Sequence, residues 1–310
     1  MCKYLLPLIG LFFVLTQFSC DEVPPFIDIE EEIMEPDTSM IDTSDIVMDT
    51  IILLDTFYIS GTIPTAQEKI VLIEDFSGVA CVNCPKGNEM VEELINEYNG
   101  RVIGMTLHAG NFANPRPENA DSFRIPETVN ISTFLNVIAY PSAAIDRFKF
   151  EGEFALTITN RNTWPIRTAE RIETTAPVNL EISTTFDAST NRLTALIKAV
   201  YTETIIEEIH NLSVFVLESG IIDRQDTNDP EVESGYILDY EHNHVVRDMM
   251  TPATGIQLNS EEIVPGLTIE KEFTMIIPEK WVPANMEVVA TVQKTGISKE
   301  VLQAAEAHVE

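Results

Sequence analysis

The sequence is poor in cysteine and in basic residues. It has 4 cysteines among 310 residues, and 19 Lys and Arg stand against 50 Asp and Glu, which gives a formal net charge of −31. A protein that binds nucleic acid needs a basic face to neutralise phosphates, and so large an acidic excess argues against one. We therefore expect no nucleic-acid partner, and the sequence predicts neither a cofactor nor a bound metal.

The apolar run near the N-terminus is short. Residues 5–15 follow Lys3, are too few to span a bilayer, and lead to the dipeptide Ser19-Cys20. This arrangement resembles a bacterial lipoprotein signal, and the alternative is an ordinary secretion signal. The resemblance implies that residues 1–19 are removed and that Cys20 is lipidated, so that the acyl chains anchor the protein to a membrane.

Basic residues are absent from the segment that follows. Between Asp21 and Asp55 every charged residue is acidic, and three prolines interrupt the chain. Such segments usually stay solvated, so residues 20–59 are predicted to form an acidic tether, in which residues 51–54 could dock as an edge strand. The pair Asp21-Glu22 resembles the acidic signal that sends some Gram-negative lipoproteins to the cell surface. The alternative, that this pair is simply part of a solvated acidic tether, explains it equally well.

Only two cysteines remain for thiol chemistry once Cys2 leaves with the signal and Cys20 carries lipid. These are Cys81 and Cys84, in the stretch "EDFSGVACVNCPKG". A zinc site needs four ligands and usually a second cysteine pair, which this chain does not have. Disulfides persist outside the cytoplasm, so the pair is either a working dithiol or an inert structural disulfide.

The cysteine pair falls between a predicted strand and a predicted helix. Residues 70–76 are apolar and β-branched, residues 85–99 have helical spacing, and residues 101–108 form a second apolar run. A thiolate at a helix N-terminus is stabilised by free N–H groups, and the thiolate is the attacking species. Cys81, the first and more exposed cysteine, is the candidate nucleophile, and Cys84 would resolve the mixed disulfide.

This segment resembles the thioredoxin superfamily. "EDFSGVACVNC" matches strand, acid, loop and C-x-x-C, and the resemblance implies that Asp75 is a buried acid that handles the proton of Cys84. "LNVIAYPSAAIDRF" resembles the loop that faces the cysteines, which implies a cis bond before Pro141 and substrate-peptide binding by Tyr140. The predicted thioredoxin-like α/β domain covers residues 60–175 and ends in a helix.

Three features depart from the thioredoxin pattern. Val82 and Asn83 replace the usual Gly-Pro between the cysteines, and Ala80 replaces the aromatic residue before them. Residues 110–129 form an insertion rich in Pro and Asn. Loops of this length are often functional, and this one could wall a substrate groove.

The second half changes to alternating apolar and polar residues. Strands are predicted at 180–182, 193–201, 211–218, 236–247, 268–277, 286–294 and 300–309. Short strands with polar turns indicate an antiparallel, immunoglobulin-like sandwich over residues 176–310. His242 and His244 lie two apart and could hold one metal ion if both are on a strand, but a polar strand or loop packed against the first domain is the simpler interpretation.

The whole pattern resembles the twenty-eight-kilodalton outer-membrane lipoprotein family of Gram-negative bacteria. The motifs that carry this resemblance are the lipid signal, "EDFSGVACVNCPKG", "AYPSAAIDR" and "YEHNHVVRD". It implies a lipid-anchored protein of the outer membrane, facing the periplasm or the surface. Two functions follow: a thiol–disulfide oxidoreductase acting on protein or peptide substrates, or a non-catalytic adhesin or binding lipoprotein that binds a surface ligand.

Overall fold

Two large β-sheets, a separate two-stranded hairpin and three α-helices make up the part of the chain that the structure, a computed structural model, describes: residues 50–259 and 262–309. The predictions about the signal, Cys20, Asp21-Glu22 and the tether up to residue 49 lie outside these ranges. No helix within them is both long and apolar enough to cross a membrane.

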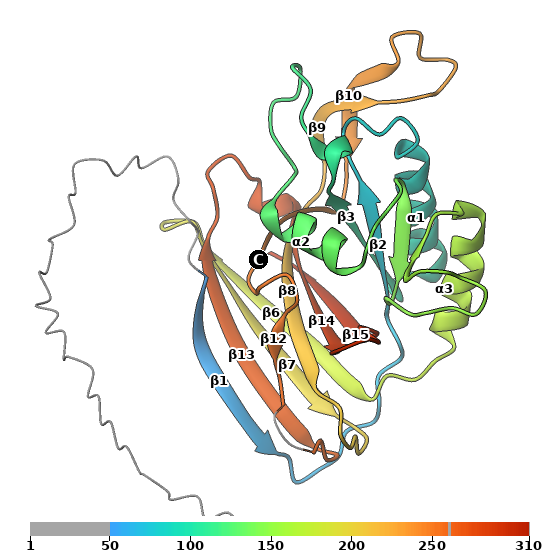
Figure 1. Cartoon of the computed structure of the whole chain (residues 1–310). Coiled ribbons are helices and arrows are strands. Elements are labelled where there is room, and N and C mark those ends of the chain that lie inside the picture. The colour runs from blue at the N-terminus through green and yellow to red at the C-terminus, as the bar shows by residue number, and fades with distance from the viewer. Residues whose placement is uncertain (1–49, 260–261, 310) are drawn as a thin grey trace, which may run out of the picture. The chain divides into compact units, whose positions relative to one another are not determined.

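The larger sheet is mixed and runs through both halves of the sequence (Figure 1). In spatial order its strands are β15 (Val301–His308), β14 (Met286–Lys294), β8 (His210–Glu218), β11 (Val245–Met249), β3 (Val102–His108), β2 (Val71–Ser77), β4 (Ser142–Ile145) and β5 (Thr157–Ile158), with β12 (Ile256–Gln257) paired to β8. β3 runs parallel to both β2 and β11, and the other pairs are antiparallel. The predicted α/β part is therefore continuous with strands of the second half.

Three helices cover the part of this sheet that comes from the first half of the chain. α1 (Pro85–Tyr98) and α3 (Trp164–Ile172) lie on one face, and α2 (Pro126–Phe134) lies on the other (Figure 1). Side chains along β2 alternate between the two faces, because Val71 and Ile73 pack with α1 and α3, whereas Leu72 and Phe76 pack with α2. Both faces are buried, which is why this strand is apolar throughout.

The core under α2 joins the two halves. It combines residues of β2 and β3 with residues of β8, β11, β14 and β15, among them Phe215, Leu217 and Val246. The direct link is β11, where Val245 pairs with Thr106 of β3 and the Thr106 N–H donates to the His244 carbonyl at 2.7 Å. The edge of the first-half sheet is thereby covered by a strand from far along the chain.

The smaller sheet is antiparallel and packs against β8, β14 and β15. Its strands are, in order, β1 (Ile51–Ile59), β13 (Leu267–Ile276), β7 (Arg192–Tyr201) and β6 (Val178–Asp187). The alternation predicted for residues 193–201 is seen in β7, whose inward side chains Leu193, Ala195 and Ile197 are buried between the sheets. β1 is an edge strand formed by the end of the predicted tether, as its apolar residues suggested.

One predicted strand divides into two. Residues 236–247 form β10 (Tyr236–His242) and β11, because His244 has a left-handed backbone (φ 52°) that breaks the strand. β10 pairs instead with β9 (Ile221–Asp226), a strand that the sequence did not predict. The β9–β10 hairpin stands at the end of the sheet nearest the cysteines (Figure 1).

Buried ion pairs lie next to strands β2 and β4. Arg147 donates two hydrogen bonds to Glu74, at 2.8 and 2.7 Å, and neither side chain is more than 1 % exposed. Asp146 is held by Lys69 and Arg171, both at 2.9 Å. Charges that are removed from water need such pairing. This network therefore holds Asp146 and Arg147, the two residues that follow β4, in place.

Candidate functional site

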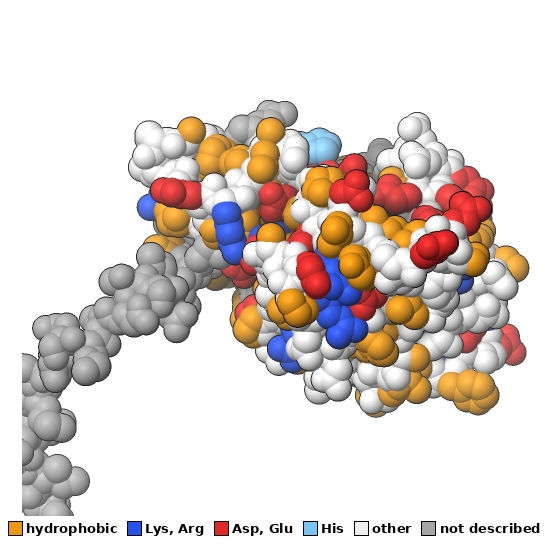
Figure 2. All heavy atoms as spheres, turned by 90° about the horizontal axis from the view of Figure 1, so that it is seen from above, with side chains coloured by type: hydrophobic (Ala, Val, Ile, Leu, Met, Phe, Trp, Pro, Cys, Tyr) orange, Lys and Arg blue, Asp and Glu red, His pale blue; other side chains and the backbone are white. Residues whose placement is uncertain are grey.

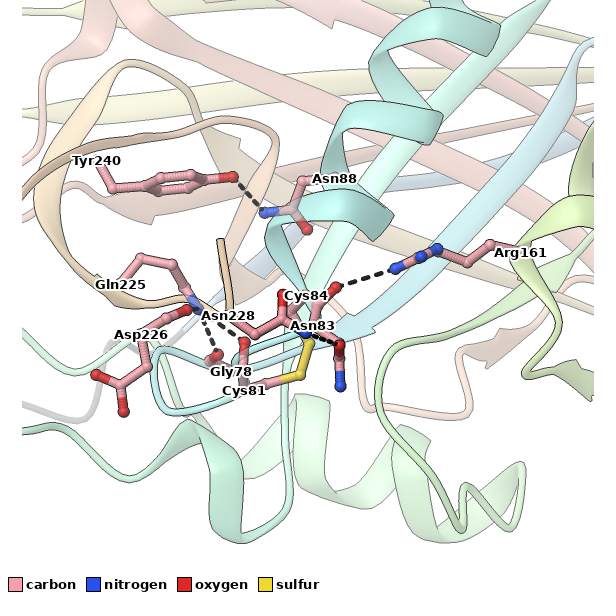
Figure 3. Close-up of a disulfide and its surroundings, with 10 residues drawn as sticks. All are labelled: Gly78, Cys81, Asn83, Cys84, Asn88, Arg161, Gln225, Asp226, Asn228 and Tyr240. Atoms are coloured by element: carbon pink, nitrogen blue, oxygen red, sulfur yellow. Dashed lines mark hydrogen bonds between the residues drawn. A yellow bond between two sulfur atoms is a disulfide. The ribbon is translucent and has the colours of Figure 1, made fainter. Parts of the chain in front are cut away.

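Cys81 and Cys84 form a disulfide, with an S–S distance of 2.08 Å (Figure 3). They lie in the loop of residues 78–84, here called the cysteine loop, which connects β2 to α1. Cys84 is the N-cap of α1, and its carbonyl accepts from the N–H groups of Gly87 and Asn88 at 2.8 and 3.0 Å. The pair therefore stands at the positive end of a 14-residue helix, where a thiolate is stabilised.

Both cysteines are buried. Cys81 is 3 % exposed and Cys84 is 0 % exposed. The order agrees with the expectation that Cys81 is the more accessible, but the difference is small. Access to the sulfur atoms therefore depends on what covers the cysteine loop.

Asp75 lies behind the helix start, fully buried on β2. A Cβ placed on Gly87 would be 3.4 Å from its Oδ2 and 3.0 Å from the Pro141 Cβ, so the acid, the helix and the proline meet at one point. Its Oδ1 has no hydrogen-bond partner among the described residues. Burial raises its pKa to about 8, which the positive charge of Arg161 partly offsets. Asp75 can therefore hold or release a proton near neutral pH.

Asn88 connects this acid to the second half of the chain. In the orientation that satisfies its hydrogen bonds, the Asn88 amide nitrogen donates to Asp75 Oδ2 at 2.9 Å and its oxygen accepts from the Tyr240 hydroxyl at 3.2 Å. Tyr240 belongs to β10, and Figure 3 shows its ring reaching over α1 toward Asn88. The carboxyl group is thus oriented by side chains from two separate parts of the sequence.

The bond between Tyr140 and Pro141 is cis, as predicted. These two residues line a groove of about 340 Å³ that also contains Asn83, from between the cysteines, and Arg161. The Tyr140 ring is directed elsewhere, since its hydroxyl contacts Ser132 at 3.2 Å. Tyr140 therefore lines the groove chiefly with its backbone.

A segment of the second half covers the other side of the cysteine loop (Figure 3). This covering segment is residues 225–228, at and just after the end of β9. The buried Gln225 side chain donates to the carbonyl oxygens of Gly78 (3.2 Å) and Cys81 (3.1 Å). Backbone N–H groups of the segment donate to the carbonyls of Val79 (2.8 Å) and Val82 (3.0 Å). The carbonyls on this side are thus already occupied, whereas the groove at Pro141 meets the cysteine loop at Asn83.

The insertion at residues 110–129 supports the covering segment. Arg116 bonds Asp226 at 2.9 Å, and the Asn119 amide donates to the Arg224 carbonyl at 2.8 Å. The Phe112 backbone also lies so close to Gly78 that a Cβ there would be 2.4 Å away, so only glycine fits. The insertion does not line the groove at Pro141, in contrast to what its length suggested.

The three central histidines have different surroundings. His244 is flanked by Glu92 and Glu287 at 3.4 Å each; burial opposes its charge, but these carboxylates outweigh burial and raise its pKa to about 10. His108 and His242 are buried, 5.7 Å apart between ring centroids, with no hydrogen bond to their ring nitrogens among the described residues. Within residues 50–259 and 262–309, no three His, Cys, Asp or Glu side chains form a metal-binding group.

Sequence reasoning did not identify Asn88, Arg161, Gln225 or Tyr240 as part of this site. Asn88 had a local signal, because it lies four residues after Cys84 and so shares its face of the helix. The other three come from two strands and a short 3-10 helix whose positions depend on long-range packing. Acidic and basic side chains lie next to one another on the face seen in Figure 2, and no continuous basic patch is visible there.

Strand, buried acid, cysteine pair, helix and cis-proline together define a thioredoxin-like protein with an oxidised C-x-x-C pair. A family model described as "Outer membrane protein Omp28" matches residues 130–310, more than half of the chain. The chain belongs to this family, which confirms the predicted outer-membrane location and implies the lipid anchor. The matched region includes Pro141, Arg161 and Gln225 but begins after both cysteines.

Among solved structures, HBP35 of Porphyromonas gingivalis resembles this chain with a TM-score of 0.61 at 20 % identity, covering 78 % of this chain and 76 % of that one. A protein of Agrobacterium tumefaciens (TM-score 0.44, 15 % identity, 79 % and 97 % covered) and a domain of the outer membrane lipoprotein Omp28 from P. gingivalis (0.24, 14 %, 44 % and 89 %) are more distant. The first likeness supports the fold of a mixed α/β sheet plus an antiparallel sheet. No significant match was found among curated proteins.

Proposed function

We propose that this outer-membrane protein is a thiol–disulfide oxidoreductase that acts on protein or peptide substrates. The observation that carries the proposal is the buried Asp75, which lies behind the Cys81–Cys84 disulfide at the start of α1, with its pKa raised by burial to about 8. An inert disulfide needs no such acid, and leaving a carboxyl oxygen buried without a partner lowers the stability of the fold.

The chemistry is an exchange of two electrons between two sulfur pairs. In the reducing direction the Cys81 thiolate attacks a substrate disulfide, forms a mixed disulfide and releases one substrate thiolate. The Asp75 carboxylate then accepts the Cys84 proton, and the Cys84 thiolate attacks the Cys81 sulfur. The Cys81–Cys84 bond forms again, and the second substrate thiolate leaves. The oxidising direction is the same sequence in reverse.

The substrate would approach through the groove at Pro141. The backbone of Tyr140 would pair with an extended peptide there, in the way that the thioredoxin resemblance implies. The covering segment occupies the carbonyls on the opposite side of the cysteine loop, and this favours a single approach direction. Polar side chains, mainly of asparagine and threonine, surround the groove and suit a peptide backbone.

For the second half we propose an immunoglobulin-like sandwich that serves as a spacer and support. Reading β6, β7, β8, β13, β14 and β15 as strands A, B, C, E, F and G gives the sheets A-B-E and C-F-G, which would match the immunoglobulin arrangement except that β1 takes the edge position of strand D. The free side of strand C then pairs with β11, which joins the sandwich to the thioredoxin-like sheet. The predicted division near residue 175 would separate two folds that share one sheet.

A second candidate function is a non-catalytic adhesin or binding lipoprotein that retains the thioredoxin-like scaffold. The observation that favours it is the burial of Cys81, which is only 3 % exposed. In this alternative the disulfide would hold the cysteine loop against the covering segment, and binding of a surface ligand would not depend on either thiol.

Disulfide exchange with a model peptide distinguishes the two candidates. The full-length protein, first reduced with a dithiol, should convert a peptide disulfide to its dithiol in one stoichiometric turnover. Cys81→Ser should abolish this reaction, and Asp75→Asn should slow it about 100-fold or more, because general acid–base assistance contributes about 10²- to 10⁴-fold. A wild-type protein that exchanges no faster than free cysteine would overturn the oxidoreductase proposal and leave the binding lipoprotein.

A further inference from the structure

Arg161 lies where the cysteine loop meets the groove. It begins the short 3-10 helix Arg161–Thr163 that precedes α3. Its Nη1 donates to the Asn83 carbonyl at 3.1 Å, and Figure 3 shows the side chain extended toward the segment between the two cysteines. A guanidinium group has five N–H donors, so this single bond leaves others free to face the groove.

The charged and titratable groups around the cysteines come from several elements. Asp75 belongs to β2, Lys86 to α1, Asp226 to the end of β9 and Tyr240 to β10. Asp226 is already paired with two arginines, at 2.9 and 3.0 Å, and Lys86 is exposed to solvent. Among the residues that line the groove in the described structure, Arg161 alone is charged. Its charge also lowers the pKa of the buried Asp75, against the larger effect of burial.

We propose that Arg161 is a positioning residue whose positive charge, held beside the cysteine loop by its bond to Asn83, stabilises the Cys81 thiolate of the reduced protein. This inference rests on the proposed dithiol chemistry and adds a residue from outside the C-x-x-C motif to it. A positive charge near an acid favours its ionised form, because it attracts the anion and not the neutral thiol. The N-terminus of α1 acts in the same direction, so the two contributions add.

The test is the pH dependence of Cys81 alkylation in the reduced full-length protein. Iodoacetamide reacts with the thiolate, and mass spectrometry of the peptide that contains Cys81 gives a rate for this residue alone. The quantity compared between variants is the pH at the midpoint of the rate profile, because limited access to Cys81 lowers the alkylation rate by the same factor at every pH. Arg161→Gln keeps a hydrogen-bond donor but removes the charge, whereas Arg161→Lys keeps the charge. Lys86→Gln is the matched control, which removes an exposed charge close to the same loop.

We expect Arg161→Gln to raise the midpoint by about one pH unit, and Arg161→Lys to retain most of the wild-type value. Lys86→Gln should shift it much less, because water screens an exposed charge. A midpoint unchanged in Arg161→Gln, equal shifts in the Gln and Lys variants, or an equal shift in Lys86→Gln would each overturn the inference. If wild-type protein shows no disulfide exchange, the proposed function fails, and the same midpoints still decide the role of Arg161.

Discussion

The side-chain amide of Gln225 donates a hydrogen bond to the carbonyl oxygen of Cys81, at 3.1 Å. These residues are 144 positions apart in the sequence. The contact means that a residue from the second half of the chain holds the loop of the candidate nucleophile. It also explains why the cysteine pair is so well buried although it lies at the end of a sheet.

Replacing Gln225 should loosen the cysteine loop. Gln225→Leu keeps the approximate size of the side chain but leaves the Gly78 and Cys81 carbonyls without this donor, which costs about 1–3 kcal/mol. Urea unfolding measures the loss, and alkylation of reduced Cys81 should become faster. Asn228→Ala is the control, because its exposed side chain bonds only the Asn83 side chain and the backbone pairing remains. Equal stability of Gln225→Leu and wild type would contradict the assigned contact.

Asp75 should lower the stability of the folded protein at neutral pH. Burial raises its pKa from 3.8 to about 8, so between these values the folded state binds more protons than the unfolded state. Its contribution to stability therefore falls as the pH rises from about 4 to about 8.

Asp75→Asn removes this dependence. The variant should match wild type near pH 3.5 and be more stable by a few kcal/mol near pH 8, since a tenfold change in proton affinity corresponds to about 1.4 kcal/mol. Urea unfolding of the oxidised protein across this range measures the difference. Asp239→Asn, at an exposed position, should change nothing. A gain that is independent of pH would contradict the raised pKa of Asp75.

The Glu74–Arg147 pair should be needed for stability. Arg147→Met leaves the Glu74 carboxylate buried without its partner, and breaking a buried pair in this way costs about 3–5 kcal/mol. Adding Glu74→Leu should recover most of this loss, because no unpaired charge then remains. Lys198→Met breaks an exposed pair with Glu181 and should cost less than about 1 kcal/mol. Thermal unfolding compares the variants, and a cost for Arg147→Met as small as that of Lys198→Met would refute this role.

His242 should make the fold sensitive to acid. Burial lowers its pKa from 6.5 to about 4, an effect that Asp223 opposes. The unfolded state therefore takes up a proton first, and stability is lost as the pH falls from about 6.5 to about 4. His242→Phe should flatten this part of the stability curve, whereas His308→Gln, at a side chain 77 % exposed, should not. An unchanged acid dependence in His242→Phe would show that other groups control it.

Local patterns in the sequence were enough to predict the strand, loop and helix around Cys81, because each is encoded within a few residues. The cis bond before Pro141 was predicted from the resemblance of its loop to the thioredoxin pattern of a hydrophobe, proline and a hydroxyl residue in order. β9 was missed because its sequence, "IIDRQD", is short and mostly polar, and it becomes a strand only by pairing with β10. Long-range pairing of this kind has no local signal.

The sequence indicated that the segment around His242 and His244 packs against the first domain, but it did not predict that a strand of this segment joins the first-half sheet. β11 pairs with β3 through a single residue pair. The two strands also share a buried core that contains residues of both halves. The sequence of β11, "VVRDM", would equally suit an edge strand of an independent sandwich. The contacts that place Gln225 and Tyr240 at the cysteines follow from this junction, so the composition of the site depends on the whole fold.

The most direct test of the central claim is to trap the reaction intermediate. Full-length Cys84→Ser, reduced and mixed with a peptide disulfide, lacks the resolving thiol and should accumulate a mixed disulfide on Cys81, detected by mass spectrometry of the intact protein and of its peptides. Cys81→Ser should accumulate little or none, because Cys84 is fully buried. No adduct on Cys81, or adducts formed equally on either cysteine, would contradict the account of Cys81 as the nucleophile of a working dithiol.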